Sequence, residues 1–474
     1  MVGLIIIDGT DLTDRLLDGG TSASGQITDI FGTLAQTKTY RFRDYDGYLN
    51  PFEPEGFFNL RNYRGLEVTE SDSLGVVTFR GTIDKVQMTD SLECIVTASE
   101  PLTIFLDWPV EATDQNTYSG FQVAGAVALG VSVLTVDGGS NIIPDGTVCW
   151  FGDSKVPSYL ATSTDDTGGA TTEITLDRPL ETPIDDNQII TFAVPQTTTG
   201  PQALKDALTT SNPDILLDGT FDILAASDTA NGYQIIVNVM EQDDIDLRSY
   251  IQQIASMTQT YIFQKNDGYY TCRRGLQWDG ENITDEVSGD ELCAPVEPEF
   301  DDSELIIGYS LIFKRSTNEA ARLDADVDPA LVRKHRGIKY WKPVPTASTY
   351  KGLKYLYASK ESAAYFGNLR LAYYSEPQVI VSCTGKRAYN QDPNRALDIY
   401  IGKQVSLTLR SFVDEPAIVV AFQYDEASLS YKNITFKLNK TVSGQASPEM
   451  IIAIGTESGD SLLTESGGLL LIEG

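Results

Sequence analysis

Alternating apolar and polar residues near the N-terminus predict a set of antiparallel strands. The runs are short, rich in β-branched and aromatic residues, and bounded by Gly, Asp or Ser, which is typical of half-buried strands. They cover residues 39–43, 65–69, 76–88 and 92–98. We expect these four runs to form a meander that bends into a barrel at Gly81, because a glycine within a strand marks a bulge or a close backbone approach.

A change of composition marks residues 119–196. This stretch is rich in Gly, Thr and Asp, short of Lys and Arg, and interrupted by turn signals at short intervals. The pattern predicts a small all-β module that is inserted into a host domain.

Helical periodicity begins after residue 200. Gly200-Pro201 starts a short helix with proline in its first turn. Residues 247–263 have helical spacing that runs into a strand, and a hairpin follows with its turn at Asn266-Asp267-Gly268. Another helix is expected at 359–374. Further strands are expected at residues 305–313, 378–384, 404–410, 417–424 and 434–438.

The composition sets limits on the class of protein. The chain has 474 residues, enough for several domains, and 41% of them are hydrophobic. No apolar run reaches membrane-spanning length. The first residues have neither a basic segment nor a small-residue cleavage site, so we expect no secretory signal and folding in a cytoplasm.

Five cysteines lie far apart without a C-x-x-C pair. This spacing supports neither a disulfide framework nor a thiolate zinc site. We expect reduced thiols that are mostly buried as small hydrophobic groups. They are Cys94, Cys149, Cys272, Cys293 and Cys383.

The formal net charge is −32 at pH 7. Proteins that grip nucleic acid concentrate Lys and Arg against phosphate, so this balance argues against ordinary nucleic-acid binding. Two interpretations remain. The charge serves solubility, or it belongs to a surface that lets a polyanion pass without sticking.

No residue pattern predicts catalysis or metal binding. The single histidine, His335, lies in a basic loop rather than beside a partner on a shielded apolar face. Asp324, Asp326 and Asp328 resemble the start of a calcium loop, but Pro329 and His335 stand where that loop needs Gly and Glu. Neither a P-loop nor a G-x-S-x-G elbow is present. We therefore expect no catalytic, cofactor-binding or metal-binding residues and no enzyme activity.

Tyrosines and lysines gather between residues 339 and 374. They could form a stacking groove for single-stranded nucleic acid or a tyrosine-rich subunit interface. Because the rest of the chain is acidic, we favour the interface, where the basic strip has an acidic surface to pair with. The lysines are Lys339, Lys342, Lys351 and Lys354.

Three stretches resemble tail hub proteins of long-tailed bacteriophages and related tail-like machines. The first has the family's turn at Asp46-Gly47, its proline segment at Asn50-Pro51-Phe52 and its F-x-G-x-I strand at residues 79–83. The second is similar to the family's helix and D-G hairpin at residues 246–275. The third is similar to its closing G-x-x-V-x-L strands at 402–442. Together they cover about a third of the chain in the family's order.

The resemblance implies a mainly β fold with minor α (α+β), multi-domain, with two related tube-type β-barrels, peripheral domains and the inserted all-β module. The expected boundaries are 1–118 for the first tube-like barrel, 119–196 for the inserted module, 197–300 for an α/β peripheral domain, 301–400 for second tube-like and peripheral segments, 401–456 for closing strands and 457–474 for a Gly/Ser-rich tail.

The family's function would follow from geometry. A homotrimer with two barrels per chain presents six similar barrels, so it caps a six-fold tail tube, matches it to a three-fold tip and forms part of an acidic DNA-exit channel. The implied partners are the tail tube or distal tail protein, tail tip or fibre proteins, the tape measure protein, and genomic DNA that passes without specific binding. The implied location is the virion, at the tail tip or baseplate, after synthesis in the host cytoplasm.

The resemblance also gives a role to the long connection at residues 50–63. We interpret it as an arm that reaches a neighbouring subunit, with a backbone restricted by proline and aromatic anchors. The candidate contacts are Pro51, Phe52, Pro54, Phe57, Phe58 and Tyr63. The alternatives left open are a host-receptor-binding protein, a cell-wall-degrading protein of the tail tip, and a baseplate ring protein of another symmetry.

Overall fold

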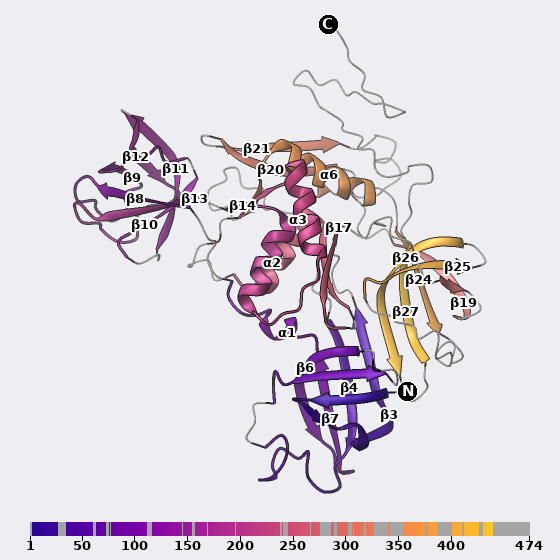
Figure 1. Cartoon of the computed structure of the whole chain (residues 1–474). Helices are drawn as coiled ribbons and strands as arrows, with labels where there is room; N and C mark the ends of the chain where they lie inside the picture. Colours follow the sequence, from indigo (N-terminus) through magenta and orange to yellow (C-terminus); the bar gives the residue numbers. More distant parts are fainter. Residues whose placement is uncertain are drawn as a thin grey trace.

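The computed structural model in Figure 1 contains sheets, a closed barrel and a few helices. It describes residues 2–26, 35–59, 63–72, 75, 77–110, 116–144, 146–153, 157–167, 169–194, 196–237, 239, 245–265, 267–274, 286–288, 292–301, 306, 308–316, 319–326, 340–341, 355–374, 378–385, 401–409, 412–425 and 430–438. The prediction of a mainly β, multi-sheet chain with minor α is confirmed. No helix among these residues is long and apolar enough to cross a membrane.

The N-terminal residues form one half of a large sheet. Its strands run in the order β3-β4-β7-β6-β5-β1-β2 and curve around a shared apolar core. They are β1 (Val2–Ile7), β2 (Thr10–Asp11), β3 (Leu16–Gln26), β4 (Ala35–Arg43), β5 (Glu67–Asp72), β6 (Val77–Met88) and β7 (Glu93–Ser99). A Cβ added at Gly81 would lie 2.6 Å from the carbonyl oxygen of Ser99, which confirms the close backbone approach expected there.

The expected four-strand meander is wrong in one respect. Strands β5, β6 and β7 do follow one another, but β4 pairs with β7 and not with β5. The connection after β4 therefore has to cross the end of two intervening strands, a distance of about 14 Å at the usual strand spacing. Its length follows from the strand order.

The C-terminal residues form the other half of the same sheet. The order is β19-β24-β27-β26-β25-β18, and β26 then pairs with β3 of the N-terminal half. The strands are β18 (Glu286–Ser288), β19 (Leu292–Asp301), β24 (Gln378–Gly385), β25 (Gln404–Leu409), β26 (Phe412–Asp425) and β27 (Ser430–Leu438). Figure 1 shows the two halves side by side.

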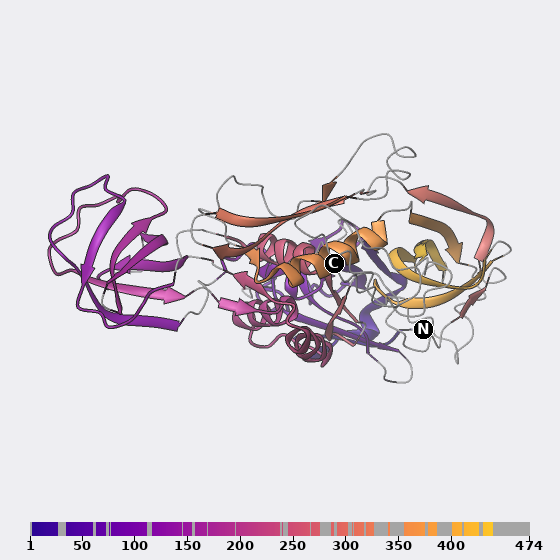
Figure 2. The same cartoon turned by 90° about the horizontal axis from the view of Figure 1, so that it is seen from above.

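A closed six-stranded barrel is inserted between the N-terminal half and the rest of the chain. Its strand order is β10-β11-β12-β9-β8-β13, and it closes where β13 pairs with β10, from Ala193 against Val148 to Ile190 against Phe151. Figure 2 shows this barrel standing to one side of the remaining layers. The strands are β8 (Asn116–Val123), β9 (Val133–Asp137), β10 (Thr147–Phe151), β11 (Ser158–Thr167), β12 (Ala170–Leu176) and β13 (Ile189–Val194).

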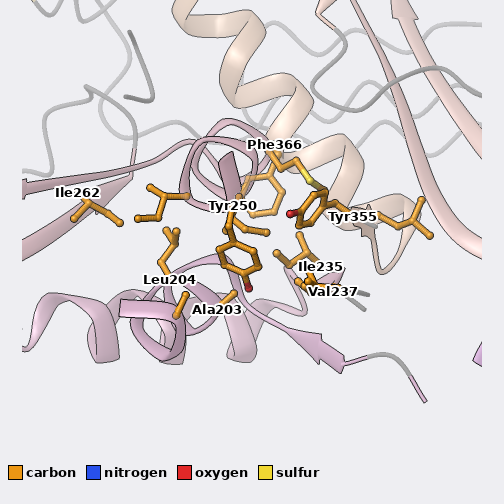
Figure 3. Packing of buried hydrophobic residues seen from close by; sticks show 14 of the residues in the cluster. Ala203, Leu204, Ile235, Val237, Tyr250, Ile262, Tyr355 and Phe366 are labelled. Atoms are coloured by element: carbon orange, nitrogen blue, oxygen red, sulfur yellow. The ribbon is translucent and has the colours of Figure 1, made fainter. Parts of the chain in front are cut away.

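A central layer packs helices against a second sheet. The helices are α1 (Leu102–Phe105), α2 (Gly200–Ser211), α3 (Thr220–Asn231), α4 (Leu247–Thr258) and α6 (Lys360–Tyr374). The sheet has the order β14-β15-β23-β20-β21, with β22 beside β20. Its strands are β14 (Gln196–Thr198), β15 (Ile235–Val237), β20 (Gly308–Ser316), β21 (Glu319–Asp326), β22 (Tyr340–Trp341) and β23 (Tyr355–Tyr357). Figure 3 shows Leu204, Ile235, Tyr250 and Phe366 of this layer in one apolar cluster.

The helix-to-hairpin unit is confirmed. Helix α4 begins at Asp246, whose side chain accepts a hydrogen bond from the Ser249 N–H, and it leads directly into strand β16 (Thr260–Gln264). Strand β17 (Tyr270–Arg274) pairs back on β16 after a turn that contains Gly268. The expected helices at α2 and α6 are also present, whereas α3 was not predicted.

Buried apolar side chains of the described residues form four clusters, and each contains one cysteine. Cys94 lies in the N-terminal half, Cys149 in the closed barrel, Cys272 in the central layer and Cys383 in the C-terminal half. All four are buried thiols that form no disulfide among the described residues. Burial raises the pKa of the Cys94 thiol and of the Cys272 thiol to about 12, because the thiolate loses its hydration.

We predict that these four thiols are unreactive in the folded protein. In a Cys293→Ser background, an aromatic disulfide reagent at pH 8 should find no fast-reacting thiol until denaturant is added, and then four. A thiol that reacts at the rate of a free cysteine without denaturant would contradict the buried placement of its cluster. Each single Cys→Ser variant then identifies which cluster opens first.

Candidate assembly surfaces

The two halves of the large sheet repeat the same strand order. The N-terminal order β3-β4-β7-β6-β5-β1 corresponds, strand for strand along the sequence, to the C-terminal order β19-β24-β27-β26-β25-β18. One difference is the last pair, since β1 is antiparallel to β5 whereas β18 is parallel to β25. The chain therefore contains two related barrel-forming halves.

The correspondence extends to single residues. The β6–β7 ladder skips Asp84, and the β26–β27 ladder skips Val420 at the same place. The β5–β6 and β25–β26 ladders each shift register after four pairs. Because a bulge occupies a fixed position in a ladder, these coincidences align β6 with β26 without ambiguity.

Equivalent positions carry similar side chains. β6 and β7 bury Ile83 and Val96 and pack the partly buried Val86 against the same core. The equivalent residues of the C-terminal half are all buried; they are Val419, Ile434 and Phe422. On the opposite face the equivalents are Gln87 and Gln423, Thr97 and Thr435, and Thr39 and Ser382. The repeat therefore shares one apolar face and one face of hydroxyl and amide groups.

The seam between the halves consists of backbone pairing. Residues 22–26 of β3 lie opposite residues 421–425 of β26 in antiparallel register, from Ser22 against Asp425 to Gln26 against Ala421. The strands at the seam are unlike, because β3 corresponds to β19 and β26 corresponds to β6. The seam is thus a head-to-tail contact between two similar units.

The β16–β17 hairpin braces this seam. Its turn touches the N-terminal half, where a Cβ added at Gly268 would lie 2.7 Å from Arg80 Cδ. Its strands touch the C-terminal half, where Phe263 joins the apolar cluster and Arg273 donates to the carbonyl oxygen of Gly402 at 3.3 Å. One rigid element therefore contacts both halves.

Besides the short terminal strands β2 and β18, two longer strand edges of the large sheet have no pairing partner among the described residues. Strand β19 is paired only with β24, and Lys85–Met88 of β6 are paired only with β7. On its other side β6 is covered as far as Ile83, which exchanges backbone hydrogen bonds with Gly65 and Leu66. Open edges of this kind are the usual sites of pairing with another chain.

Two ion pairs neutralise charges beside the N-terminal strands. Arg41 contacts Glu93 at 2.7 Å, and Arg80 contacts Glu67 at the same distance. All four side chains are at least partly exposed, so each pair contributes little to stability. Their effect is on the surface potential, because an arginine held by a carboxylate attracts phosphate less.

A buried ion pair connects β4 and β5 across the barrel interior. Lys38 Nζ lies 2.5 Å from Glu70 Oε2, and both side chains are more than nine-tenths buried. Lys38 also lies 5.8 Å from the centre of the Phe79 ring. Since β4 and β5 are not neighbours in the sheet, this pair ties two strands that the backbone leaves apart.

The connection from Asp44 to Asn59 is a folded loop of successive turns. The Asp44 carboxylate accepts from the Leu49 N–H at 2.7 Å, and the Asn50 side chain accepts from the Phe52 N–H at 2.9 Å. Such side-chain bonds to nearby backbone are what Asp and Asn supply in turns. The loop therefore holds its shape by local bonds.

Arg15, the last residue of a 3-10 turn (Thr13–Arg15) just before β3, fixes the start of this loop. Its guanidinium makes two hydrogen bonds of 2.7 Å to Asp46 and lies 4.6 Å from the centre of the Tyr48 ring. The hydrogen bonds from Arg15 hold the pKa of Asp46 well below its usual range. Asp46 is therefore ionised at neutral pH and can keep its ion pair with Arg15.

The structure separates the residues predicted to form the arm. Phe57 and Phe58 are 6% and 1% exposed and belong to the core of their own barrel, whereas Phe52 is 86% exposed. Tyr63 packs against Phe58 with a ring separation of 6.4 Å. Of the prolines, Pro54 is exposed and Pro51 is half-buried.

This burial corrects the role expected for the two adjacent phenylalanines. They anchor the loop on its own barrel, because their rings fill the space between the loop and the strands. They are therefore not available as contacts with a neighbouring subunit. Phe52 is the aromatic ring that the loop presents to solvent, and nothing in the sequence distinguishes it from the other two.

The other candidate residues carry no site in the described structure. Asp324 and Asp326 lie in β21, while His335, Asp328, Pro329 and the lysines at 339, 342, 351 and 354 fall outside the described residues, as does the tail at 457–474. Within the described part of the chain, no group of three or more His, Cys, Asp or Glu side chains is arranged to hold a metal ion.

Comparison with known proteins gave structural similarities only. No family model matches, and no curated protein matches. The 43 kDa tail protein of prophage MuSo2 from Shewanella oneidensis is similar with a TM-score of 0.46 and 7% identity, over 92% of this chain and 98% of that one. A tail protein from Neisseria meningitidis MC58 has a TM-score of 0.46 and 9% identity, over 92% and 95%.

Prophage tail protein gp18 from Listeria monocytogenes EGD-e has a TM-score of 0.41 and 9% identity, over 91% of each chain. Similarities of this size do not identify a function. The function of this chain has to be inferred from its own strand pairing and surfaces.

We predict opposite effects for two phenylalanines of the same loop. Phe58→Ser should lower the free energy of unfolding by about 3–5 kcal/mol or more, because a buried ring is lost and a hydroxyl is buried in its place. Phe52→Ser, the matched control, should change it by less than about 0.5 kcal/mol. Denaturant unfolding followed by Cys94 reactivity measures both, and equal effects would contradict the two placements.

Proposed function

We propose that this chain is a structural tail hub. Three copies would form a ring that caps the distal end of a phage tail tube and matches its six-fold symmetry to a three-fold tip. The observation that carries the proposal is the internal repeat: two halves with the same strand order and a bulge at the same place, after Ile83 and after Val419, joined head to tail in one sheet.

The repeat supports a three-copy ring by a symmetry argument. A head-to-tail contact uses two different surfaces, so a unit that makes it on one side still offers the complementary surface on the other. Each chain already contains one such contact, between β3 and β26. Three chains then supply six barrel-forming halves with one kind of contact repeated around the ring.

The surface chemistry is compatible with a channel for DNA. The chain has a net charge of −32, and two arginines beside the N-terminal strands, Arg41 and Arg80, are paired with carboxylates. Phosphate is repelled by such a surface over a distance of about 8 Å at physiological salt. We propose that genomic DNA leaves through the ring without specific binding, as a non-catalytic passage.

The arm keeps a narrower role in this proposal. The loop from Asp44 to Asn59 would contact the neighbouring subunit through Phe52, with Pro51 and Pro54 limiting its backbone. The inserted barrel, expected at residues 119–196, would stand at the periphery and meet tail tip or fibre proteins. The tail tube protein and the tape measure protein would meet the two ends of the ring.

We predict three chains per particle. Native mass spectrometry or light scattering at micromolar concentration should give a trimer, and electron microscopy should show a ring with six similar densities. One chain or six per particle would contradict the hub proposal. A muralytic gel assay serves as the test of the alternative, since lysis of cell walls would favour a cell-wall-degrading protein.

We also predict that Phe52→Ser weakens assembly by at least about tenfold, since an exposed aromatic anchor in an interface contributes more than about 1 kcal/mol. The trimer-to-monomer midpoint on dilution measures the change. Leu129→Ser is the control, because Leu129 is an exposed apolar residue of the inserted barrel, 62% exposed. Equal midpoints for both variants would remove Phe52 from the interface.

A further inference from the structure

We propose that β19 of one chain pairs with β6 of the next, in a register that the chain's own seam specifies. Residues 297–301 of one copy would lie antiparallel to residues 85–89 of the second copy. This inference rests on the proposed ring, and it adds the strands, the direction and the residue pairs of the contact.

The register follows from two correspondences. The shared bulges align Lys85, Val86 and Gln87 of β6 with residues 421, 422 and 423 of β26. The second correspondence concerns β19 and β3. β19 pairs with β24 as β3 pairs with the equivalent strand β4, and this aligns residues 297–301 of β19 with residues 22–26 of β3. Within the chain, residue 423 lies opposite residue 24. The same contact between chains places Gln87 opposite Glu299.

The strand edges are placed to make this contact. In the part of the chain that the structure describes, β19 has a neighbour on one side only, and β6 beyond Ile83 has none on the side of β5. On the equivalent side of β26, β25 pairs with the first part of the strand and β3 pairs with the part beyond the end of β25. The open part of β6 is thus equivalent to the part of β26 that is already occupied.

The exposed side chains fit a contact between strands. Gln87 and Glu299 are both exposed in the single chain, so their pairing buries no charge away from water. Pro298 can contribute only its carbonyl oxygen, since proline has no N–H, and proline in a sheet is confined to edge strands and bulges. β19 is therefore suited to be an edge strand in the single chain and to pair with β6 of a second copy in the ring.

The contact is directional, which limits what can assemble. β19 has its complement in β6 and not in another β19, so two copies cannot satisfy both edges by a two-fold arrangement. Copies join head to tail, and the ring is complete when the open β6 edge of the last copy pairs with the open β19 edge of the first. The pairing of unlike edges also limits aggregation, because each open edge pairs with one complementary edge in one register only.

Engineered disulfides test the register. In a Cys293→Ser background, Gln87→Cys and Glu299→Cys are placed on separate chains, mixed and oxidised. Directly opposite residues of antiparallel strands have Cβ atoms about 4.5–5.5 Å apart, close enough for a bond after a small adjustment. We expect a covalent dimer on a non-reducing gel, and covalent trimers when both substitutions are on one chain.

Two controls make the result specific. Ser24→Cys with Gln423→Cys has the same geometry within one chain and should form an internal disulfide. Gln87→Cys with Phe300→Cys is the negative control. Residue 300 is next to residue 299 in β19, so its side chain leaves the opposite face of the strand, and no disulfide to residue 87 should form. A strong link in this second control would mean a register shifted by one residue.

The outcomes separate this inference from the ring itself. A trimer by native mass that gives the internal control but no 87–299 link overturns the strand contact and leaves the hub proposal standing. A monomer by native mass overturns the hub proposal. If oxidation also gives no 87–299 disulfide, the strand contact is overturned as well. A linked dimer in the mixing experiment supports the contact whatever the final number of copies.

Discussion

The backbone pairing of β3 with β26 is the contact on which the architecture depends. It joins residues near the N-terminus to residues almost four hundred positions later, so both halves become one sheet. Closing so long a loop costs little more than closing a shorter one, since each doubling of length adds only about 0.6 kcal/mol. The chain between the two strands forms the closed barrel and the central layer, and both lie outside the seam. The β16–β17 hairpin contacts both halves and keeps the angle between them fixed.

The unlike character of the seam gives the molecule its direction. Had equivalent strands met, the two edges left open would have been of the same type, and neither would have been the complement that this head-to-tail contact uses. Because β3 meets the equivalent of β6, one edge of each type remains open. In the ring that we propose, the register seen within the chain is the template for the register between copies. Both halves keep one bulge at the same place, after Ile83 and after Val419, and a bulge sets where each strand bends.

Local patterns in the sequence determined much of the secondary structure. Apolar alternation marked β5, β6, β7 and most of the C-terminal strands, and the helix-to-hairpin unit was marked by a helical stripe and an Asp-Gly turn. Helix α3 was missed because its apolar residues are spread around the helix instead of forming a stripe, and Gly232 is the signal that could have shown its end.

What the sequence determined by itself is that many of the segments form strands with one apolar face, because both depend on residues close together in the chain. The strands β1, β3, β19 and β21 were not predicted. Only the tertiary structure decided that β4 lies beside β7, that Phe58 fills a core while Phe52 points to solvent, and that β3 finds β26. The physical reason is that strand pairing is set by hydrogen bonds between distant segments. Alternation records that a strand has a buried face, and it carries no information about which other strand lies alongside.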